Sequence, residues 1–366
     1  MKLACSFNPA FESSVLKMYK NIQLMELGFL AYKKIFQVGS KPIYFCDNLS
    51  LSLHISRSPI TEYVLHQNIF IKEKLAPIKE DVRIKSIGFH LCGDRCENIG
   101  KLGFSSHYNA SEEKEENAVR FIYKVQEDTE KDVWIENANF YSSSPEEIYS
   151  NWKSFNRILT ASKAKSIIDL SHLVIDCKNN GVDPTILIGL IDWEKVIEIH
   201  LSGIHLGKDG ILHDGHDSSV SPMAWEILEK ILHLNLLNDD VYINIEHSNT
   251  EWKYNQDSYD RDFLFLEERI NNFKSISAKT LSPLRYAKNY LKKIIKNDIE
   301  NFQEIVNHLD FTESELFDTW FHYIEKKGYR ISLSEDEMDS MIASKSQYII
   351  HSFTDFIEDI QYEDRN

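Results

Sequence analysis

The sequence predicts a (β/α)₈ barrel, a TIM barrel, followed by a separate module of helices. Short apolar runs rich in β-branched and aromatic residues recur eight times within residues 1–276. Longer stretches with helical periodicity separate these runs, which is the pattern of repeated β-α units. A barrel of this class typically takes about 250 residues, so the repeating part has a suitable length for closure.

The eight predicted strands follow one another through this part of the chain. They are Lys2–Phe7, Gln23–Gly28, Leu51–Ile55, Ile84–Leu91, Asp132–Asn137, Ser166–Leu170, Val196–Ser202 and Val241–Glu246. Each is bounded by segments with helical or turn character. We therefore predict one closed barrel domain over residues 1–276.

Helix starts are recognisable between the strands. The segment Ser144–Glu147 is a capping serine followed by proline and two acids, which is typical of a first helical turn. Ser221 and Pro222 precede apolar residues that are spaced for one helix face. The acidic run Glu112–Glu116 indicates a solvated helix start.

The alternation stops after about Ile276. From Leu281 to the end, residues 281–366 have the pattern of several amphipathic helices, with one short strand-like run at Tyr329–Leu333. The segment Leu281–Pro283 suits a junction, because the residue before a proline is pushed out of the helical region. We predict a separate helical module that binds a peptide or a partner, or that mediates dimerisation.

The composition excludes several classes of protein. The longest apolar runs are far too short to span a membrane, and the N-terminus lacks the order of a secretion signal, so we expect a cytoplasmic protein. A net charge of −16 speaks against nucleic acid and favours a cationic partner or peptide. Five scattered cysteines, an odd number, indicate reduced thiols, and no second pair completes a zinc knuckle.

Metal-competent side chains gather where the predicted strands end. Each of strands three to eight ends in or runs into a histidine, aspartate or glutamate, and two more candidates lie between strands seven and eight. The set is His54, His90, Glu136, Asp169, His172, His200, Asp214, His216 and Glu246. In a barrel of this class the C-terminal strand ends build the active site, so these side chains should share one pocket.

A pocket with this many carboxylates and imidazoles needs cations, because buried unpaired charge is costly and close carboxylates repel. Mixed nitrogen and oxygen ligands suit iron, manganese or zinc and disfavour calcium and magnesium. The number of candidates exceeds what one ion can use. We therefore predict two or three metal ions.

Other residues on this face have less decisive patterns. Either of His205 and His213 could be a ligand or an ordinary histidine, and we expect His247 and Asp217 to orient ligands. Cys92 and Cys96 suit small buried positions better than a redox role. Arg57 and Arg95 suit either a clamp on a substrate carbonyl or carboxylate or a surface salt bridge.

The motifs resemble those of the multinuclear non-heme iron-dependent oxidases that modify ribosomally made peptides, and within that family the methanobactin-maturing members. The resemblance covers roughly residues 1–275. The segments that carry it are Ser52–Pro59, Phe89–Leu91, Ile135–Ala138, Asp169–His172, His200–Gly203, Asp214–Asp217 with Trp225, and Ile245–Glu246.

The resemblance implies that the nine residues of the set bind two or three iron ions, Fe²⁺ or Fe³⁺. It implies an oxidase that uses dioxygen to modify a cysteine of a precursor peptide, with an oxazolone and thioamide as the expected product. A small partner protein that presents the peptide, or a fused counterpart of it in the helical module, is also implied. We predict catalytic roles for Glu246 and Arg57.

Two other functions stay open. A divalent-metal sugar isomerase or an abasic-site endonuclease also gathers histidines and acids at barrel strand ends, although the negative charge speaks against a nuclease. A metal-dependent scaffold could instead present a peptide without turnover. Oxygen uptake separates the oxidase from the scaffold, and activity on a free pentose or abasic DNA would favour the isomerase or nuclease.

Overall fold

The computed structural model describes residues 1–8, 22–36, 49–93, 107–234 and 236–275, together with residues 302, 316, 317, 320, 353 and 356. The chain divides into two compact units. The first comprises Met1–Pro184, Asp192–His233 and Leu237–Ser277, and the second comprises Thr185–Ile191, Leu234–Leu236 and Ala278–Asn366. Among the described residues, no helix combines the length and apolar character that crossing a bilayer requires.

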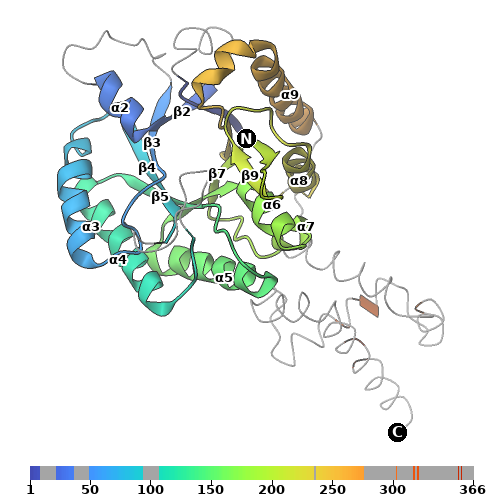
Figure 1. The fold of residues 1–366 in the computed structure, drawn as a ribbon, viewed down its shortest axis with the longest axis horizontal. Coiled ribbons are helices and arrows are strands. Elements are labelled where there is room, and N and C mark those ends of the chain that lie inside the picture. Colours follow the sequence, from blue (N-terminus) through green and yellow to red (C-terminus); the bar gives the residue numbers. More distant parts are fainter. Residues whose placement is uncertain are drawn as a thin grey trace. The chain divides into compact units, whose positions relative to one another are not determined.

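The first unit is a closed barrel of eight parallel strands, with its helices around the outside (Figure 1). The strands are β1 (Lys2–Ser6), β2 (Ile22–Gly28), β3 (Ser50–Ile55), β4 (Ile84–Leu91), β5 (Asp132–Asn137), β6 (Lys165–Asp169), β7 (Val196–Leu201) and β10 (Tyr242–Ile245). They follow the order β1-β10-β7-β6-β5-β4-β3-β2 around the barrel. All eight predicted strands are confirmed, and no end differs by more than one residue.

The helical segments lie between these strands and after the last of them. They are α2 (Phe29–Phe36), α3 (Val64–Phe70), the π-helix η2 (Ile71–Leu75), η3 (Ala76–Ile78), α4 (Glu112–Thr129), α5 (Pro145–Ser162), α6 (Leu170–Asn179), α7 (Pro184–Leu187), α8 (Pro222–His233), η4 (Thr250–Tyr254) and α9 (Gln256–Ser275). The predicted starts are confirmed: the Ser144 hydroxyl accepts from the Glu147 amide at 3.3 Å, and α8 begins at Pro222.

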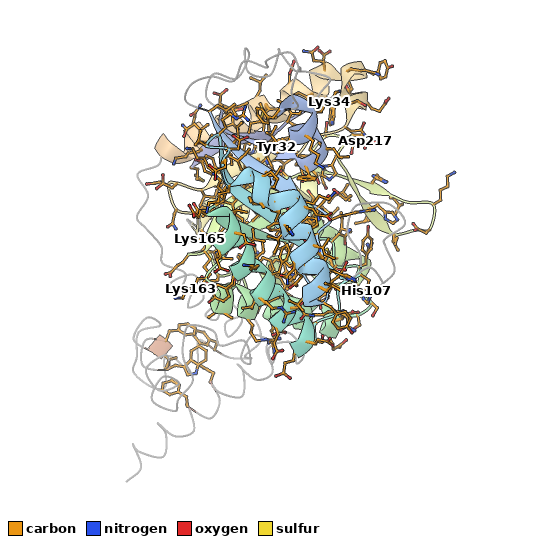
Figure 2. The ribbon with its side chains drawn as sticks, turned by 90° about the vertical axis from the view of Figure 1, so that its left-hand side faces the viewer. Tyr32, Lys34, His107, Lys163, Lys165 and Asp217 are labelled. Carbon is orange, nitrogen blue, oxygen red and sulfur yellow. The ribbon has the colours of Figure 1, made fainter. Side chains whose placement is uncertain are left out.

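An antiparallel hairpin between β7 and α8 was not predicted. It consists of β8 (Gly203–Leu206) and β9 (Leu212–Gly215) and projects from the barrel near Asp217 (Figure 2). Its strands are too short to show a clear period of two in the sequence. Gly203 is required here, because a Cβ at this position would lie 2.1 Å from the Ser218 hydroxyl.

The barrel interior is layered along the strand direction. Ala4, Leu24, Trp134 and Ile167 form a buried apolar cluster inside it. Side chains two positions apart on a strand share a face, so the next inward layer consists of Ser6, Glu26, Glu136 and Asp169. These four are buried too. The polar layer thus lies directly above the apolar layer, toward the C-terminal ends of the strands.

Within Ala278–Asn366, the second unit is described at six positions, all in helices. Phe302, Leu316, Phe317, Trp320, Phe353 and Phe356 are buried. The rings of Phe302 and Phe317 stack at 5.4 Å, and Trp320 meets Phe353 edge to face at 5.3 Å. These contacts give the unit an aromatic core of its own. The predicted junction at Leu281–Pro283 and the strand at Tyr329–Leu333 lie outside the described residues.

Candidate metal centre

A cavity of about 670 Å³ opens over the polar layer at the C-terminal strand ends. Its lining draws on the ends of β1, β2, β3 and β4, and on the segments that follow β5, β9 and β10. The predicted site residues that reach its surface are His54, Arg57, His90, His172, Asp214, His216 and Glu246. Glu136, Asp169 and His200 are fully buried.

Three overlapping groups of potential ligands occur among the described residues. They are Glu26, His54, His200 and Glu246; then His54, His90 and Glu136; then Glu136, Asp169, His200 and Glu246. Within each group the ligand atoms lie within 4.8 Å of one another, and all members are buried. Strand register explains the proximity, because His90 pairs with Glu136 and Asp169 pairs with His200 on adjacent strands.

His54 contacts a different carboxylate on each side of its ring. Its Nδ1 lies 2.9 Å from Glu26 Oε1, in a hydrogen bond, and its Nε2 lies 2.9 Å from Glu136 Oε2. The second contact lacks the geometry of a hydrogen bond. Glu26 therefore fixes the ring, while Nε2 and the Glu136 carboxylate face one shared space.

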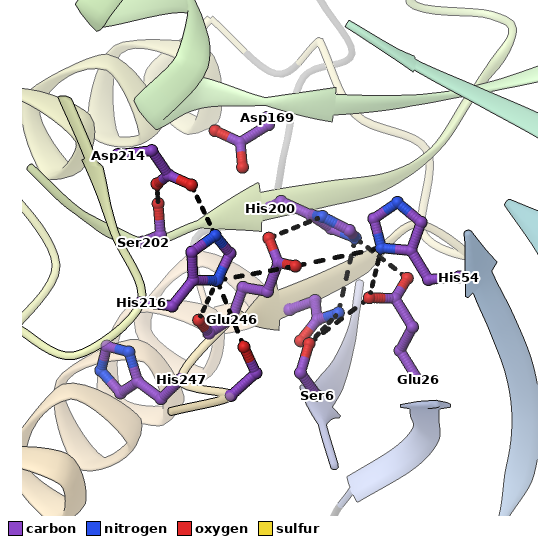
Figure 3. Close-up of polar contacts among 12 residues, drawn as sticks. Ser6, Glu26, His54, Asp169, His200, Ser202, Asp214, His216, Glu246 and His247 are labelled. Atoms are coloured by element: carbon purple, nitrogen blue, oxygen red, sulfur yellow. Dashed lines mark hydrogen bonds and ion pairs between the residues drawn. The ribbon is translucent and has the colours of Figure 1, made fainter. Parts of the chain in front are cut away.

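His200 is held in a similar way. Its Nε2 lies 3.3 Å from Glu198 Oε1 and 3.4 Å from Glu26 Oε2. Its Nδ1 lies 3.4 Å from Glu246 Oε2 and makes no hydrogen bond. Figure 3 shows Glu246 between His54 and His216, with its other contact to His200.

The residues fit metal ions by a direct criterion. Buried polar atoms in proteins almost always have hydrogen-bond partners, and those that lack them call for an explanation. Several atoms of this cluster are buried without one: His54 Nε2, His200 Nδ1, both Glu136 oxygens, Asp169 Oδ2 and Glu246 Oε2. They belong to the three ligand groups described above. Cations bound among them would provide the missing partners.

A second constellation adjoins these groups. Asp214 Oδ2 lies 2.5 Å from His216 Nε2 and 3.5 Å from His172 Nε2, and the Ser202 hydroxyl donates to the other Asp214 oxygen at 2.8 Å. His216 Nδ1 lies 2.9 Å from the Glu246 carbonyl oxygen. Asp214 lies on β9 and His216 directly follows this strand. The positions of both side chains therefore depend on the hairpin of β8 and β9.

Asp169 combines a structural task with its place in the cluster. Its Oδ1 accepts from the His172 amide at 2.7 Å and caps α6, while Oδ2 makes no hydrogen bond. The Asn137 side chain donates to the Asp169 carbonyl at 2.9 Å and accepts from its amide at 2.8 Å. The strand end is therefore fixed, and Oδ2 stays directed at the cluster.

The ionisation of the cluster reflects its crowded charges. Burial would lower the pKa of His54, but Glu26 and Glu136 raise it well above its ordinary value. Burial would raise the pKa of Glu136, but the surrounding histidines, His90 first, hold it well below its usual range. Burial lowers the pKa of His90 itself to about 4. Without bound ions, protonated imidazoles would carry the balancing positive charge.

Sequence reasoning missed three residues of the site. Glu26 lies in the predicted strand Gln23–Gly28, two positions after the inward Leu24, so alternation alone could have identified it. Glu198 stands two positions before His200 on β7 and is fully buried. Tyr141 lines the cavity with its backbone in the left-handed region, at φ 54°, which no sequence pattern signals.

The two histidines that the sequence left open, and His247, which we expected to orient ligands, lie outside the three ligand groups. His205 is exposed on the hairpin. His213 is buried, and its Nε2 lies 3.0 Å from Asp209. His247 contacts Asp262 at 2.8 Å and stacks on Trp252 at 4.1 Å, which fixes the segment after β10.

The remaining predicted residues have these positions. Arg57 is exposed and lines the cavity, and Asp217 is exposed. Cys92 is buried as a free thiol, as are the other two described cysteines, Cys5 and Cys177. Arg95, Cys46 and Cys96 lie outside the described residues.

The barrel and its pocket define an enzyme of the (β/α)₈ class whose buried histidines and carboxylates can hold metal ions. The sequence model of the "RiPP precursor modification enzyme MbnB/TglH/ChrH" family matches residues 71–248; RiPPs are ribosomally made, post-translationally modified peptides. The match confirms the family resemblance over these residues. The segment contains every predicted metal ligand except His54, and the match supports a peptide-modifying role.

The chain is also similar to curated relatives and to solved structures. A UPF0276 protein of Nitrosospira multiformis is 21% identical over 206 residues, which cover 56% of this chain and 69% of the relative. A UPF0276 protein of Shewanella loihica is 22% identical with the same coverage. An L-ribulose 3-epimerase structure has a TM-score of 0.46 at 10% identity, covering 76% of this chain and 99% of its own. Endonuclease IV from Thermus thermophilus has a TM-score of 0.45 at 11% identity, covering 73% and 100%.

Proposed function

We propose that this protein is a multinuclear iron enzyme that uses dioxygen to oxidise a cysteine residue of a ribosomally made precursor peptide. One observation carries the proposal: buried ligand atoms without hydrogen bonds converge beneath a cavity, in a barrel of a peptide-modifying family. The expected product is an oxazolone and thioamide or a related modification. Dioxygen, the cysteine-containing peptide and a small presenting partner are the proposed reactants and partners.

The donor set supports iron as the metal. The candidate ligands are imidazoles and carboxylates, and no described cysteine lines the cavity, which suits iron, manganese or zinc. The proposed ligands are the nine predicted residues, His54, His90, Glu136, Asp169, His172, His200, Asp214, His216 and Glu246. Bound iron would supply the redox chemistry with dioxygen and the affinity for a thiolate that these side chains lack.

The side chains of the protein position and deprotonate the substrate in this proposal. Glu246 borders the cavity and is 8% exposed, so a peptide thiol can reach its carboxylate. Burial would raise its pKa, but His216 and His200 lower it, so Glu246 is ionised at neutral pH and can accept the thiol proton. Arg57, at the cavity wall, can hold a carbonyl or carboxylate of the peptide.

The test combines metal analysis with turnover. Protein purified without added metal is analysed by plasma mass spectrometry, then loaded with iron and examined by Mössbauer spectroscopy. Two or three irons per chain with a coupled pair, and oxygen uptake with a mass change in a cysteine-containing substrate peptide, support the proposal. About one zinc or manganese without coupled iron contradicts it and favours the isomerase alternative. Iron and peptide binding without oxygen uptake favours a scaffold.

A further inference from the structure

One wall of the cavity combines aromatic and aliphatic surface with positive charge. It is formed by α2, by the residue two positions after β3, and by the end of α3 with η2. We call it the cationic wall, and its residues are Phe29, Leu30, Lys33, Arg57, Phe70 and Lys74. Elsewhere the lining includes uncharged polar side chains, such as Asn139, Tyr141 and Ser248.

The two lysines of this wall form no ion pair with a carboxylate of the described lining. The carboxylates that line the cavity, Glu26, Asp214 and Glu246, belong to the metal centre, where histidines surround them. Neither Lys33 nor Lys74 forms an ion pair with another residue in the described ranges. The wall therefore presents cations that a bound ligand can neutralise.

The same pair of side chains occurs twice along the wall. Phe29 and Lys33 are four residues apart on α2, and Phe70 and Lys74 are four residues apart across α3 and η2. Residues at this spacing share a helix face. The Lys33 ammonium lies 4.7 Å from the centre of the Phe29 ring. A ring beneath an ammonium holds the long side chain while leaving N–H groups for a ligand.

The local charge is opposite to the charge of the whole chain. With a net charge of −16, the chain as a whole repels anions. A cluster of cations at the mouth of a cavity acts over about 8–10 Å, the screening length at physiological salt. At the site itself the wall therefore favours an anion, contrary to the cationic peptide expected from net charge.

We propose that the cationic wall binds a carboxylate of the peptide substrate, next to the residue that enters the metal centre; this rests on the proposed peptide-oxidising function. The carboxylate belongs either to an acidic side chain beside that residue or to the C-terminus of the peptide. Phe29, Leu30 and Phe70 bind the apolar part of the same segment. Lys33, Lys74 and Arg57 thereby contribute to substrate specificity.

The experiment measures binding of synthetic cysteine peptides to the full, metal-loaded chain by fluorescence anisotropy with an uncharged dye. One peptide has aspartates beside the cysteine and an amidated end, a second has asparagines there, and a third has asparagines and ends in a free carboxylate. We expect the carboxylate peptides to bind roughly 10-fold more tightly than the second. The first and third peptides distinguish the two sources of the carboxylate.

The variant Lys33→Glu/Lys74→Glu should remove this preference, and so should about 0.5 M salt. The matched control is Lys72→Glu/Lys85→Glu, which changes the net charge equally at exposed positions outside the wall. Equal binding of the three peptides, no binding at millimolar concentration, or equal loss in the control variant would overturn the proposal.

This experiment needs no turnover, so it separates the two proposals. If the carboxylate preference is present but no peptide is oxidised, the oxidase proposal fails and the assignment of the wall stands. If peptides are oxidised at the same rate and with the same KM whatever their charge, the assignment of the wall fails alone.

Discussion

Glu26 Oε1 lies 2.9 Å from Nδ1 of His54 and thereby leaves Nε2 of the same ring facing the carboxylate of Glu136. A carboxylate behind a ligating imidazole fixes its tautomer and orientation and raises its basicity. Glu26 also lies 3.4 Å from His200 Nε2, so one carboxylate contacts both rings. Glu26 therefore contacts two of the imidazole rings that we propose as metal ligands.

Replacing Glu26 by glutamine should weaken metal binding without removing the side chain. The amide keeps the shape and a hydrogen bond to His54 but loses the negative charge. We expect iron affinity to fall roughly 10- to 100-fold, measured by competition with a chelator. The exposed Glu73→Gln serves as the control. Unchanged affinity in the Glu26 variant would show that this carboxylate does not support the metal centre.

Metal binding should stabilise the folded chain. Ions that bind only the folded state stabilise it by about 2.7 kcal/mol at a concentration 100 times Kd. Anaerobic addition of Fe²⁺ should therefore raise the Tm in differential scanning fluorimetry, and a chelator should reverse the shift. Glu136→Gln should abolish most of the rise in Tm, because both Glu136 oxygens are buried in the cluster without a hydrogen bond. An equal shift with Mg²⁺ would contradict a site built for nitrogen ligands.

Asp176 should make stability depend on pH. Burial raises its pKa to about 6 from the ordinary 3.8, although the Ser142 hydroxyl and amide each donate to it at 2.8 Å. Because the folded pKa is the higher one, this group stabilises the fold below about pH 4 and loses that contribution as pH rises through 6. Asp176→Asn should thus gain stability relative to the wild type between pH 4 and 7, by up to about 3 kcal/mol.

Urea unfolding of the metal-free chain across this pH range measures the difference. The exposed Asp183→Asn is the control and should leave the pH profile unchanged. Parallel profiles for the wild type and the Asp176 variant would show that the buried carboxyl does not titrate in this range.

Asp262 connects α9 to the segments that follow the hairpin and β10. Its Oδ2 accepts from the Val220 amide at 3.0 Å and lies 2.8 Å from His247 Nε2. We expect Asp262→Asn to lower the free energy of unfolding by roughly 1.5–3 kcal/mol, the range for a hydrogen bond to a charged group. Chemical denaturation measures this, with the exposed Asp257→Asn on the same helix as control. A loss no larger than that of the control would contradict the connecting role.

The barrel could be predicted from sequence because its strands are short apolar runs between helices with clear starts. Strands that are buried on both faces consist of such apolar runs. The predicted strand Ile84–Leu91 has the same first and last residues in the structure. The site followed from the rule that side chains at the C-terminal strand ends share one pocket. His90 and Glu136 lie far apart in the sequence. They are neighbours at this end of the barrel because β4 and β5 pair in parallel.

Other features could not be predicted because they depend on contacts and not on pattern. Glu26 was overlooked because it stands inside an apolar strand and not at the strand end, where we expected the ligands to lie. The pairing of His247 with Asp262 on α9 joins segments that no spacing rule connects. The cationic wall escaped notice because net charge describes the whole chain and not the cavity.

The spacing of the barrel strands also sets the distance between the side chains that they carry. Backbone hydrogen bonds hold neighbouring strands about 4.8 Å apart, and metal pairs in two-metal enzymes lie about 3.5–4 Å apart. Side chains at one level of adjacent strands, such as Asp169 and His200, are therefore close enough that they could hold neighbouring ions. Exchanging one ligand for another would alter which ion binds and how tightly, while the spacing of the strands that carry the ligands would stay the same.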